Sequence, residues 1–240
     1  VLDLIGEGGM ATIHRVVDSA TQTQLALKQL RLSGGAGGEL RTAHFEREFV
    51  TLKQLAHPRI IRVYDFGFDA EQPYYTMELL DGQDARDLAP LEWSLACALL
   101  RDVASSLALV HSRRLVYRDL SPRNVRCTSD GRAKLLDFGA LTSVGVPSQI
   151  VGTPAFIAPE ALFGQPLDQR SDLYSLGALA YWLLTGQPAY RARELAELRD
   201  AWSTRPAPPA ALVPSVPEAL SSLVMSLLSH NPTGRPQHAG

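Results

Sequence analysis

The sequence predicts an α+β fold in two lobes, a small lobe rich in strands and a larger lobe made mostly of helices. Short β-branched or alternating segments, with one helical segment among them, fill residues 1–79. From residue 93 onward, long segments carry apolar side chains at helical spacing. We therefore expect one lobe from residues 1–79 and a second from residues 80–240, with a hinge near residues 78–82.

The strands of the first lobe are expected from short runs of β-branched and alternating residues. Residues 25–30 alternate with period two, which is typical of a strand with one buried face. The expected strands are residues 1–5, 13–17, 25–30, 60–66 and 74–79.

One helix is expected in the first lobe, after a glycine-rich segment at residues 33–38 that we interpret as a loop. The helix should end at His57-Pro58, because proline disfavours helical geometry at the residue before it. Its apolar residues fall on one face, at Phe45, Phe49, Leu52 and Leu55.

Three helices are expected in the second lobe, at residues 93–110, 171–184 and 217–228. Pro217 suits the first turn of the last of these. The preceding stretch, residues 205–217, is rich in proline and alanine and is expected to be an extended connector.

The composition is that of an ordinary globular domain and does not favour a nucleic-acid-binding or disulfide-rich protein. The chain has 240 residues, 45% hydrophobic and 20% charged, with a formal net charge of −2, so no basic field favours a nucleic-acid partner. Its two cysteines are too few for a disulfide framework and indicate a reducing, cytoplasmic setting.

The longest apolar stretch, residues 176–184, is interrupted by Gly177, so we expect no membrane contact from this segment. The chain starts inside an expected strand, and we expect it to be part of a longer protein.

A glycine turn lies between the first two expected strands, in the sequence Gly6-Glu7-Gly8-Gly9-Met10-Ala11. Without side chains at these positions, backbone N–H groups can approach phosphate oxygens. A plain hairpin turn explains the same residues. A dinucleotide-binding turn would lead into a helix, and here a strand follows.

Lys28 lies in the alternating strand, where a lysine usually faces solvent. A carboxylate partner on the following helix would instead hold its ammonium toward nucleotide phosphates. Glu48 is the expected partner, and Glu46 is the alternative.

Two segments of the second lobe carry carboxylates suited to catalysis. In Tyr117-Arg118-Asp119-Leu120-Ser121-Pro122-Arg123-Asn124, Asp119 can accept a hydroxyl proton and Asn124 can bind magnesium. Asp137 follows an apolar strand and precedes Phe138-Gly139, which suits a metal ligand. The alternatives are a solvated loop for the first segment and a strand ending in a turn for the second.

A fifth motif runs from Gly152 to Glu160, and Arg235 lies in the later segment 231–236. Together they offer a buried ion pair between Glu160 and Arg235, whose role would be structural.

These five motifs, in this order and at roughly these spacings, resemble those of the eukaryotic-type protein kinase domain, over essentially the whole chain. The compact sequence and the Gly-Gly-Met turn resemble bacterial serine/threonine kinases. The resemblance implies a small antiparallel sheet with one helix, a larger helical lobe, and an ATP cleft between them. It also implies transfer of the γ-phosphate of ATP to serine or threonine hydroxyls of proteins, with autophosphorylation.

The resemblance assigns roles to individual residues. Asp119 would orient the attacking hydroxyl with Lys28, Asn124 and Ser121 as further catalytic residues, and Asn124 and Asp137 would hold Mg²⁺ or Mn²⁺. The nucleotide-binding set would be Ile5, Gly6, Glu7, Gly8, Gly9, Ile13, Ala26, Lys28, Glu48, Met77, Glu78 and Leu80. Activation or structural roles would fall to Arg118, Phe138, Gly139, Thr153, Glu160, Asp172 and Arg235.

The chain departs from the family pattern mainly at Ser121, where serine/threonine kinases usually carry a lysine that contacts the γ-phosphate. This departure supports the alternative of a pseudokinase, a nucleotide-binding or regulatory module with weak transfer activity. A small-molecule kinase is a further alternative, against which the Gly152–Glu160 segment and Arg235 argue.

Arg118 precedes the expected base, as in kinases that are activated by phosphorylation of a loop. Thr142, Ser143 and Ser148 are the candidate acceptors, and a phosphate on one of them would pair with Arg118. Ordinary polar loop residues are the alternative interpretation.

Overall fold

The computed structural model describes residues 1–8, 10–31 and 38–239. Gly9 and residues 33–37 of the expected loop lie outside the described residues. The chain forms two compact units, Val1–Asp81 and Gly82–Gly240. The sequence placed the junction between residues 79 and 80.

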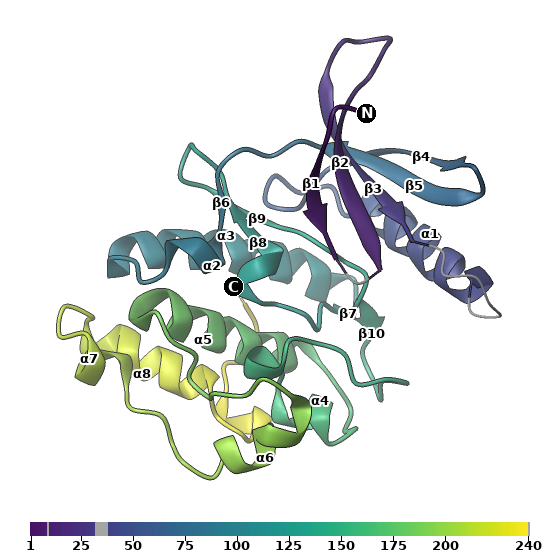
Figure 1. Ribbon diagram of the computed structural model, residues 1–240. Coiled ribbons are helices and arrows are strands. Elements are labelled where there is room, and N and C mark those ends of the chain that lie inside the picture. Colours follow the sequence, from purple (N-terminus) through teal and green to yellow (C-terminus); the bar gives the residue numbers. More distant parts are fainter. Residues whose placement is uncertain (9, 32–37, 240) are drawn as a thin grey trace. The chain divides into compact units, whose positions relative to one another are not determined.

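The Val1–Asp81 unit is a five-stranded antiparallel sheet with one helix (Figure 1). The strand order is β1-β2-β3-β5-β4. The elements are β1 (Asp3–Glu7), β2 (Ala11–Val17), β3 (Gln24–Leu30), α1 (Gly38–Gln54), β4 (Val63–Asp69) and β5 (Gln72–Glu78).

Cross-strand pairing fixes which side chains of this sheet share a face. Lys28 of β3 lies opposite Ile13 of β2 and opposite Tyr75 of β5. Directly paired residues of antiparallel strands point to the same side of the sheet. Helix α1 packs against β4 and β5 and buries Phe45, Glu48 and Leu52.

Element boundaries in this unit differ from the sequence expectations by up to three residues. Strand β1 continues through Gly6 and Glu7, so only Gly8 of the described glycines belongs to the turn itself. Strand β4 begins at Val63 instead of residue 60. Leu55 follows the end of α1 but is still buried.

The Gly82–Gly240 unit is mainly helical, with two small sheets in the orders β6-β8-β9 and β10-β7. Its strands are β6 (Gln83–Asp84), β7 (Leu115–Val116), β8 (Val125–Cys127), β9 (Ala133–Leu135) and β10 (Thr142–Ser143). Its helices are α2 (Ala85–Leu88), α3 (Trp93–Ser112), α4 (Pro159–Leu162), α5 (Gln169–Thr185), α6 (Leu198–Ala201), α7 (Pro209–Leu212) and α8 (Glu218–Leu227).

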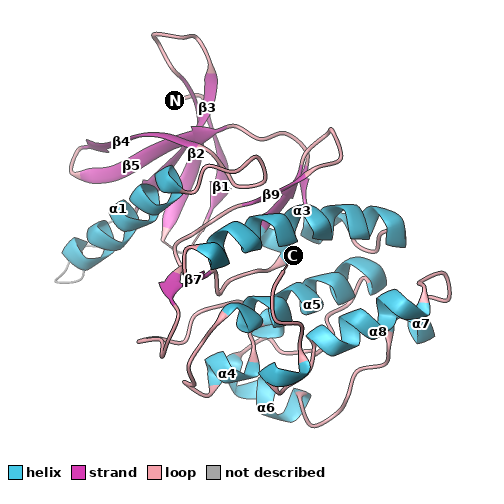
Figure 2. Cartoon of the chain, turned by 180° about the vertical axis from the view of Figure 1, so that it is seen from behind, coloured by secondary structure: helices cyan, strands magenta, loops and turns pink. Residues whose placement is uncertain are grey.

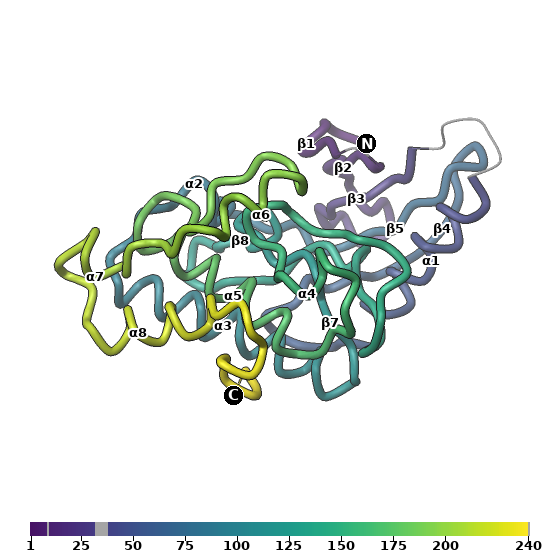
Figure 3. The backbone as a smooth tube through the Cα atoms, turned by 90° about the horizontal axis from the view of Figure 1, so that it is seen from below, coloured from purple at the N-terminus to yellow at the C-terminus, as the bar shows by residue number. Residues whose placement is uncertain are grey.

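Helix α5 forms the centre of this unit. It is buried on nearly all sides and contacts α3, α7, α8 and β7, which is the pattern of a core helix. Figure 2 and Figure 3 both show α8 beside α5. Gly177 permits this approach, because a Cβ there would lie 2.6 Å from Cβ of Leu227.

The proline-rich stretch and the last helix differ from expectation. Residues 205–217 are not a continuous extended connector, since α7 (Pro209–Leu212) lies within them. Pro217 is the N-cap of α8 and not its first helical residue.

Helix α3 is a longer apolar segment than the one singled out from the sequence. It has 20 residues, and an 18-residue stretch of it has a mean hydropathy of 1.4, so by length and composition it could cross a membrane. Its buried face holds Leu99, Val103, Leu107 and Val110 and contacts α5, β7 and β9. The core helix of a soluble protein can be equally long and apolar, so α3 is weak evidence for a membrane span.

Candidate functional site

In the first unit, Lys28 and Glu48 form an ion pair, with Lys28 Nζ 2.8 Å from Glu48 Oε1. Both side chains are largely buried, at 12% and 5% exposure. Glu46 is exposed, because it lies on the other side of α1. The structure thus selects Glu48 over the alternative partner.

The glycine turn connects β1 to β2, and the N–H of Gly8 donates to the carbonyl of Ala11 at 2.9 Å. A Cβ at Gly6 or Gly8 would make only ordinary contacts, at 3.5 and 3.7 Å. Neither glycine has a positive φ. Packing and backbone geometry within the described residues therefore do not require glycine at these two positions.

The remaining nucleotide-binding candidates of this unit lie on neighbouring strands. Ala26 of β3 is paired with Met77 of β5, and Ile13 of β2 with Lys28. Glu78 ends β5, and its carboxylate accepts a hydrogen bond from the N–H of Arg62 at 2.8 Å. The candidates that precede the turn and follow β5 are Ile5, which is 41% exposed, and Leu80, which is partly buried.

In the second unit, Asp119 is held by hydrogen bonds from neutral groups. The N–H and hydroxyl of Thr153 donate to Oδ1 at 3.0 and 2.9 Å, and Asn124 Nδ2 donates to Oδ2 at 3.0 Å. Burial raises the pKa of the Asp119 carboxyl, the bonds from Thr153 and Asn124 oppose the rise, and the charge of Asp137 adds to it. A partly buried carboxylate with a raised pKa is suited to accept a proton.

The backbone places Asn124 and Asp137 at the ends of two paired strands, since Asn124 directly precedes β8 and Asp137 lies two residues after β9. The N–H of Leu136 donates to the carbonyl of Asn124 at 2.8 Å, next to the β8–β9 pairing. The hydroxyl of Tyr117 donates to the carbonyl of Leu136, the residue before Asp137. The ring of Tyr117 also packs edge-on against Phe138, with centroids 5.1 Å apart.

Two residues of this region hold left-handed backbone conformations. Arg118 has φ +75° and Asp137 has φ +46°. Such conformations are costly for residues other than glycine and cluster at functional sites. The N–H of Gly139 donates to Asp137 Oδ1 at 3.1 Å and supports the second of them.

Asp172, at the start of α5, anchors the loop that carries Asp119. Its carboxylate is fully buried and accepts the N–H groups of Tyr117 and Arg118, each at 2.8 Å. His111 of α3 contacts the same carboxylate through Nε2 at 2.8 Å. Paired donors of this kind fix the loop backbone, which explains how it sustains the strained φ at Arg118.

A divalent cation would find oxygen ligands at Asn124 and Asp137. The amide nitrogen of Asn124 donates to Asp119, which leaves its Oδ1 for a cation. No group of three His, Cys, Asp or Glu side chains that could hold a metal alone occurs among the described residues. The carboxylate of Asp137 suits Mg²⁺, which is usually bound by one or two carboxylates together with substrate phosphates.

A family model for the protein kinase domain matches residues 1–239. The chain belongs to the protein kinase domain family. Members of the family use ATP and a divalent metal ion.

Curated bacterial relatives of this kinase domain are similar over nearly its whole length. It is 34% identical, over 97% of the chain, to the serine/threonine-protein kinase PksC of Streptomyces coelicolor, of which it covers 45%. It is 36% identical, over 99% of the chain, to the DNA damage-responsive serine/threonine-protein kinase RqkA of Deinococcus radiodurans, of which it covers 37%. It is 34% identical, over 96% of the chain, to the serine/threonine-protein kinase PknL of Mycobacterium tuberculosis, of which it covers 60%. The chain thus spans about half the length of these relatives.

The kinase domain contains the ion pair expected between Glu160 and Arg235. The two side chains meet in parallel bonds of 2.6 and 2.8 Å, and both are buried. The Arg235 guanidinium also donates to the carbonyls of Ser229, Arg170 and His230. A buried ion pair with its remaining donors satisfied fixes local structure, and losing one partner would be strongly destabilising.

Arg118 contacts the segment that follows Gly139. Its guanidinium donates to the carbonyls of Gln149 and, at 3.5 Å, of Ala140. Its Nε is buried without a hydrogen-bond partner among the described residues. Of the three candidate acceptors, Thr142 and Ser143 form β10, and Ser143 and Ser148 are exposed. Ser148 adjoins Gln149.

Ser121 differs from the other catalytic candidates in its exposure. It is 1% exposed, and its hydroxyl has no hydrogen-bond partner in the described part of the chain. In this conformation the hydroxyl does not reach solvent, so the expected contact to a phosphate would require the loop to move.

Two contacts, one in each unit, were not anticipated from the sequence. Tyr75 donates its hydroxyl to Glu48, and His111 contacts Asp172. Both join residues distant in sequence, and the only signal for Tyr75 is a polar hydroxyl on the strand face that carries Lys28.

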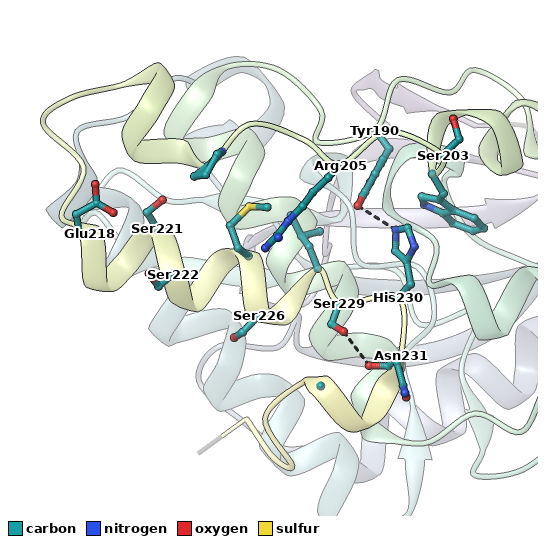
Figure 4. A pocket seen from close by; sticks show the side chains of 15 residues that line it. Tyr190, Ser203, Arg205, Glu218, Ser221, Ser222, Ser226, Ser229, His230 and Asn231 are labelled. Atoms are coloured by element: carbon teal, nitrogen blue, oxygen red, sulfur yellow. Dashed lines mark hydrogen bonds between the residues drawn. The ribbon is translucent and has the colours of Figure 1, made fainter.

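A cavity of about 780 Å³ lies in the second unit, lined by residues of α8 and of the loops that flank it (Figure 4). None of the described site residues lines it. Two hydrogen bonds join residues of its lining, His230 to Tyr190 and Ser229 to Asn231 (Figure 4). Nothing in its lining points to a particular ligand.

Proposed function

We propose that this chain is the catalytic domain of an ATP-dependent serine/threonine protein kinase. The arrangement of Asp119 supports the proposal most strongly, because a carboxylate with a raised pKa is bonded to both Asn124 and Thr153. The pseudokinase alternative is not favoured, since the curated relatives are named as serine/threonine kinases.

In the proposed reaction the acceptor hydroxyl oxygen attacks the γ-phosphorus of ATP, and the bond from that phosphorus to the β–γ bridging oxygen breaks. ADP leaves with the electron pair of that bond. Asp119 accepts the hydroxyl proton, for which its raised pKa suits it. The remaining work is positioning and charge stabilisation.

Phosphate binding is assigned to the Lys28–Glu48 pair and to backbone N–H groups of the glycine turn. The pair supports this role because the carboxylate fixes the ammonium in a largely buried position. Gly6 and Gly8 support it because neither packing nor backbone geometry requires a glycine at these two positions. Asn124 and Asp137 are assigned to Mg²⁺, which would offset charge on the transferred group.

Proteins with serine or threonine hydroxyls are the proposed substrates, and this chain is a proposed substrate of itself. Ser148 is the acceptor that the contacts of Arg118 favour, because a phosphate there would lie one residue from Gln149. Mass spectrometry of active protein should find phosphate on Ser148. We place the domain in the cytoplasm, in keeping with its two free cysteines.

A transfer assay tests the proposed function. The protein is incubated with Mg²⁺, γ-labelled ATP and a general protein substrate, and the labelled amino acids are identified. Phosphoserine or phosphothreonine should form with the wild-type chain and not with D119N. Nucleotide binding without any transfer would instead support the pseudokinase alternative.

A further inference from the structure

The carboxylate of Glu48 accepts two hydrogen bonds at one oxygen. Lys28 Nζ lies 2.8 Å from Oε1, and the hydroxyl of Tyr75 lies 2.9 Å from the same atom. Tyr75 is 2% exposed and Glu48 is 7% exposed. The glutamate is therefore tied both to the lysine and to the strand beside it.

The register of the sheet explains how the two donors converge. Lys28 of β3 and Tyr75 of β5 are direct cross-strand partners, so their side chains share the face that α1 covers. The ammonium also lies 5.7 Å from the centroid of the Tyr75 ring. Phe45 of α1 packs on the same ring at 4.9 Å. Lysine, tyrosine and glutamate thus form one cluster that joins two strands to the helix.

We propose that Tyr75 is a positioning residue for phosphate transfer, which holds the Glu48 carboxylate where it can fix the Lys28 ammonium. The inference rests on the proposed function, in which Lys28 binds the nucleotide phosphates. It makes the ion pair a three-member unit, in which Lys28 of β3 and Tyr75 of β5 together hold the carboxylate of α1.

The physical reason lies in the freedom of the glutamate. A carboxylate on a helix can change rotamer or move with the helix, and a single bond to a flexible lysine restrains it weakly. A hydroxyl on a buried aromatic ring has few rotamers and comes from the neighbouring strand. A hydrogen bond to a charged group shifts an equilibrium by about tenfold or more, so losing it should populate arrangements in which Glu48 leaves Lys28.

The decisive variant is Tyr75→Phe, which removes only the hydroxyl. Its matched control is Tyr74→Phe, the same change at the next residue of β5, where the ring lies across Gly67 instead. Both are assayed for kcat and for KM of ATP well below the unfolding temperature of each variant. We expect Y75F to lower kcat/KM for ATP by about five- to tenfold and Y74F to change it by less than about twofold.

A thermal-unfolding cycle tests the contact independently of activity. Y75F is measured in the wild-type chain and in a Glu48→Ala chain, where the acceptor is absent. We expect Y75F to lower the unfolding midpoint by about 3–8 °C in the wild-type chain and by less than half of that in Glu48→Ala. If Glu48→Ala does not fold, Glu48→Gln replaces it, since a bond to a neutral amide is about half as strong.

The outcomes separate the two proposals. If the wild-type chain transfers no phosphate, the proposed function fails, and the unfolding cycle alone then decides whether Tyr75 holds Glu48. If transfer occurs but Y75F behaves like Y74F, Tyr75 has no positioning role. An equal cost of Y75F with and without Glu48 overturns the inference as well, because the hydroxyl would then act through another group.

Discussion

Two carboxylates, one in each unit, are held in opposite ways: Glu48 is buried and Asp119 is partly buried. Glu48 accepts its bonds from a cationic ammonium and a tyrosine hydroxyl. Within the described part of the chain, Asp119 accepts its bonds from neutral groups of Thr153 and Asn124, and burial together with the charge of Asp137 raises its pKa. The first carboxylate is compensated and fixed, whereas the second is left ready for a proton. The comparison shows that the groups bonded to a carboxylate determine whether it is held as a fixed charge or can take up a proton.

Removing the proton acceptor should have the largest effect on transfer. We expect D119N to lower kcat by about 10³-fold or more, because the amide cannot take the hydroxyl proton. The change should leave the affinity for an ATP analogue within about threefold. Transfer rates measured with labelled ATP and binding measured by calorimetry check both expectations. Retention of a tenth of the wild-type kcat would remove Asp119 from the proposed role.

Removing the cation that pairs with Glu48 should lower both stability and activity. Lys28→Met leaves Glu48 buried without its cation, and breaking a buried pair in this way costs about 3–5 kcal/mol. We expect transfer to fall by about 10²-fold or more, together with a clear drop in the unfolding midpoint. Chemical denaturation of K28M beside D119N makes the comparison, since D119N should show no such loss. Equal destabilisation of the two variants would contradict the contrast.

The pH dependence should separate the carboxylates again. Asp119 has a raised pKa in the folded chain, so the rate should fall on acidification with an apparent pKa above the ordinary aspartate value. The folded state then binds the proton more tightly than the unfolded state. The contribution of Asp119 to stability is therefore present at low pH and is lost as pH rises through the folded pKa.

Measurements of kcat and of the unfolding midpoint on the wild type and D119N check the direction of this pH dependence. They should cover about pH 4 to 8, where we expect the chain to stay folded. The stability of D119N relative to the wild type should increase as pH rises. A relative stability that falls with rising pH would show that the pKa of Asp119 is lowered.

The smallest effect is expected at Ser121. Its buried hydroxyl has no hydrogen-bond partner among the described residues, so Ser121→Ala removes a group that is costly to bury. We expect the variant to be more stable by up to about 1 kcal/mol and to keep transfer within about twofold. Denaturation and steady-state kinetics measure the two. A tenfold loss of kcat would show that the hydroxyl reaches the phosphate after all.

The sequence predicted the ion pairs whose two residues belong to recognisable motifs. Lys28 with Glu48 and Glu160 with Arg235 were expected and are present. It could not show which donors would surround a carboxylate, because contacts such as Tyr75–Glu48 and His111–Asp172 depend on tertiary packing.

Backbone and burial were equally hidden from the sequence. The helix α7 forms within a segment whose composition favours extended chain, since packing against α5 and α8 outweighs local preference. The burial of Ser121 could not be foreseen, because serine is usually exposed in loops. The assignments of individual residues to ATP and metal remain predictions.

The left-handed backbone at Asp137 has a consequence for how such a chain changes over generations. A residue other than glycine at φ +46° carries a cost that glycine would not, and Asp119 is likewise a burden to the folded state at neutral pH. In a lineage released from the need to transfer phosphate, replacing Asp137 by glycine would relieve the backbone cost at this position. The backbone there would favour loss of the carboxylate, and selection for the proposed activity would have to oppose it.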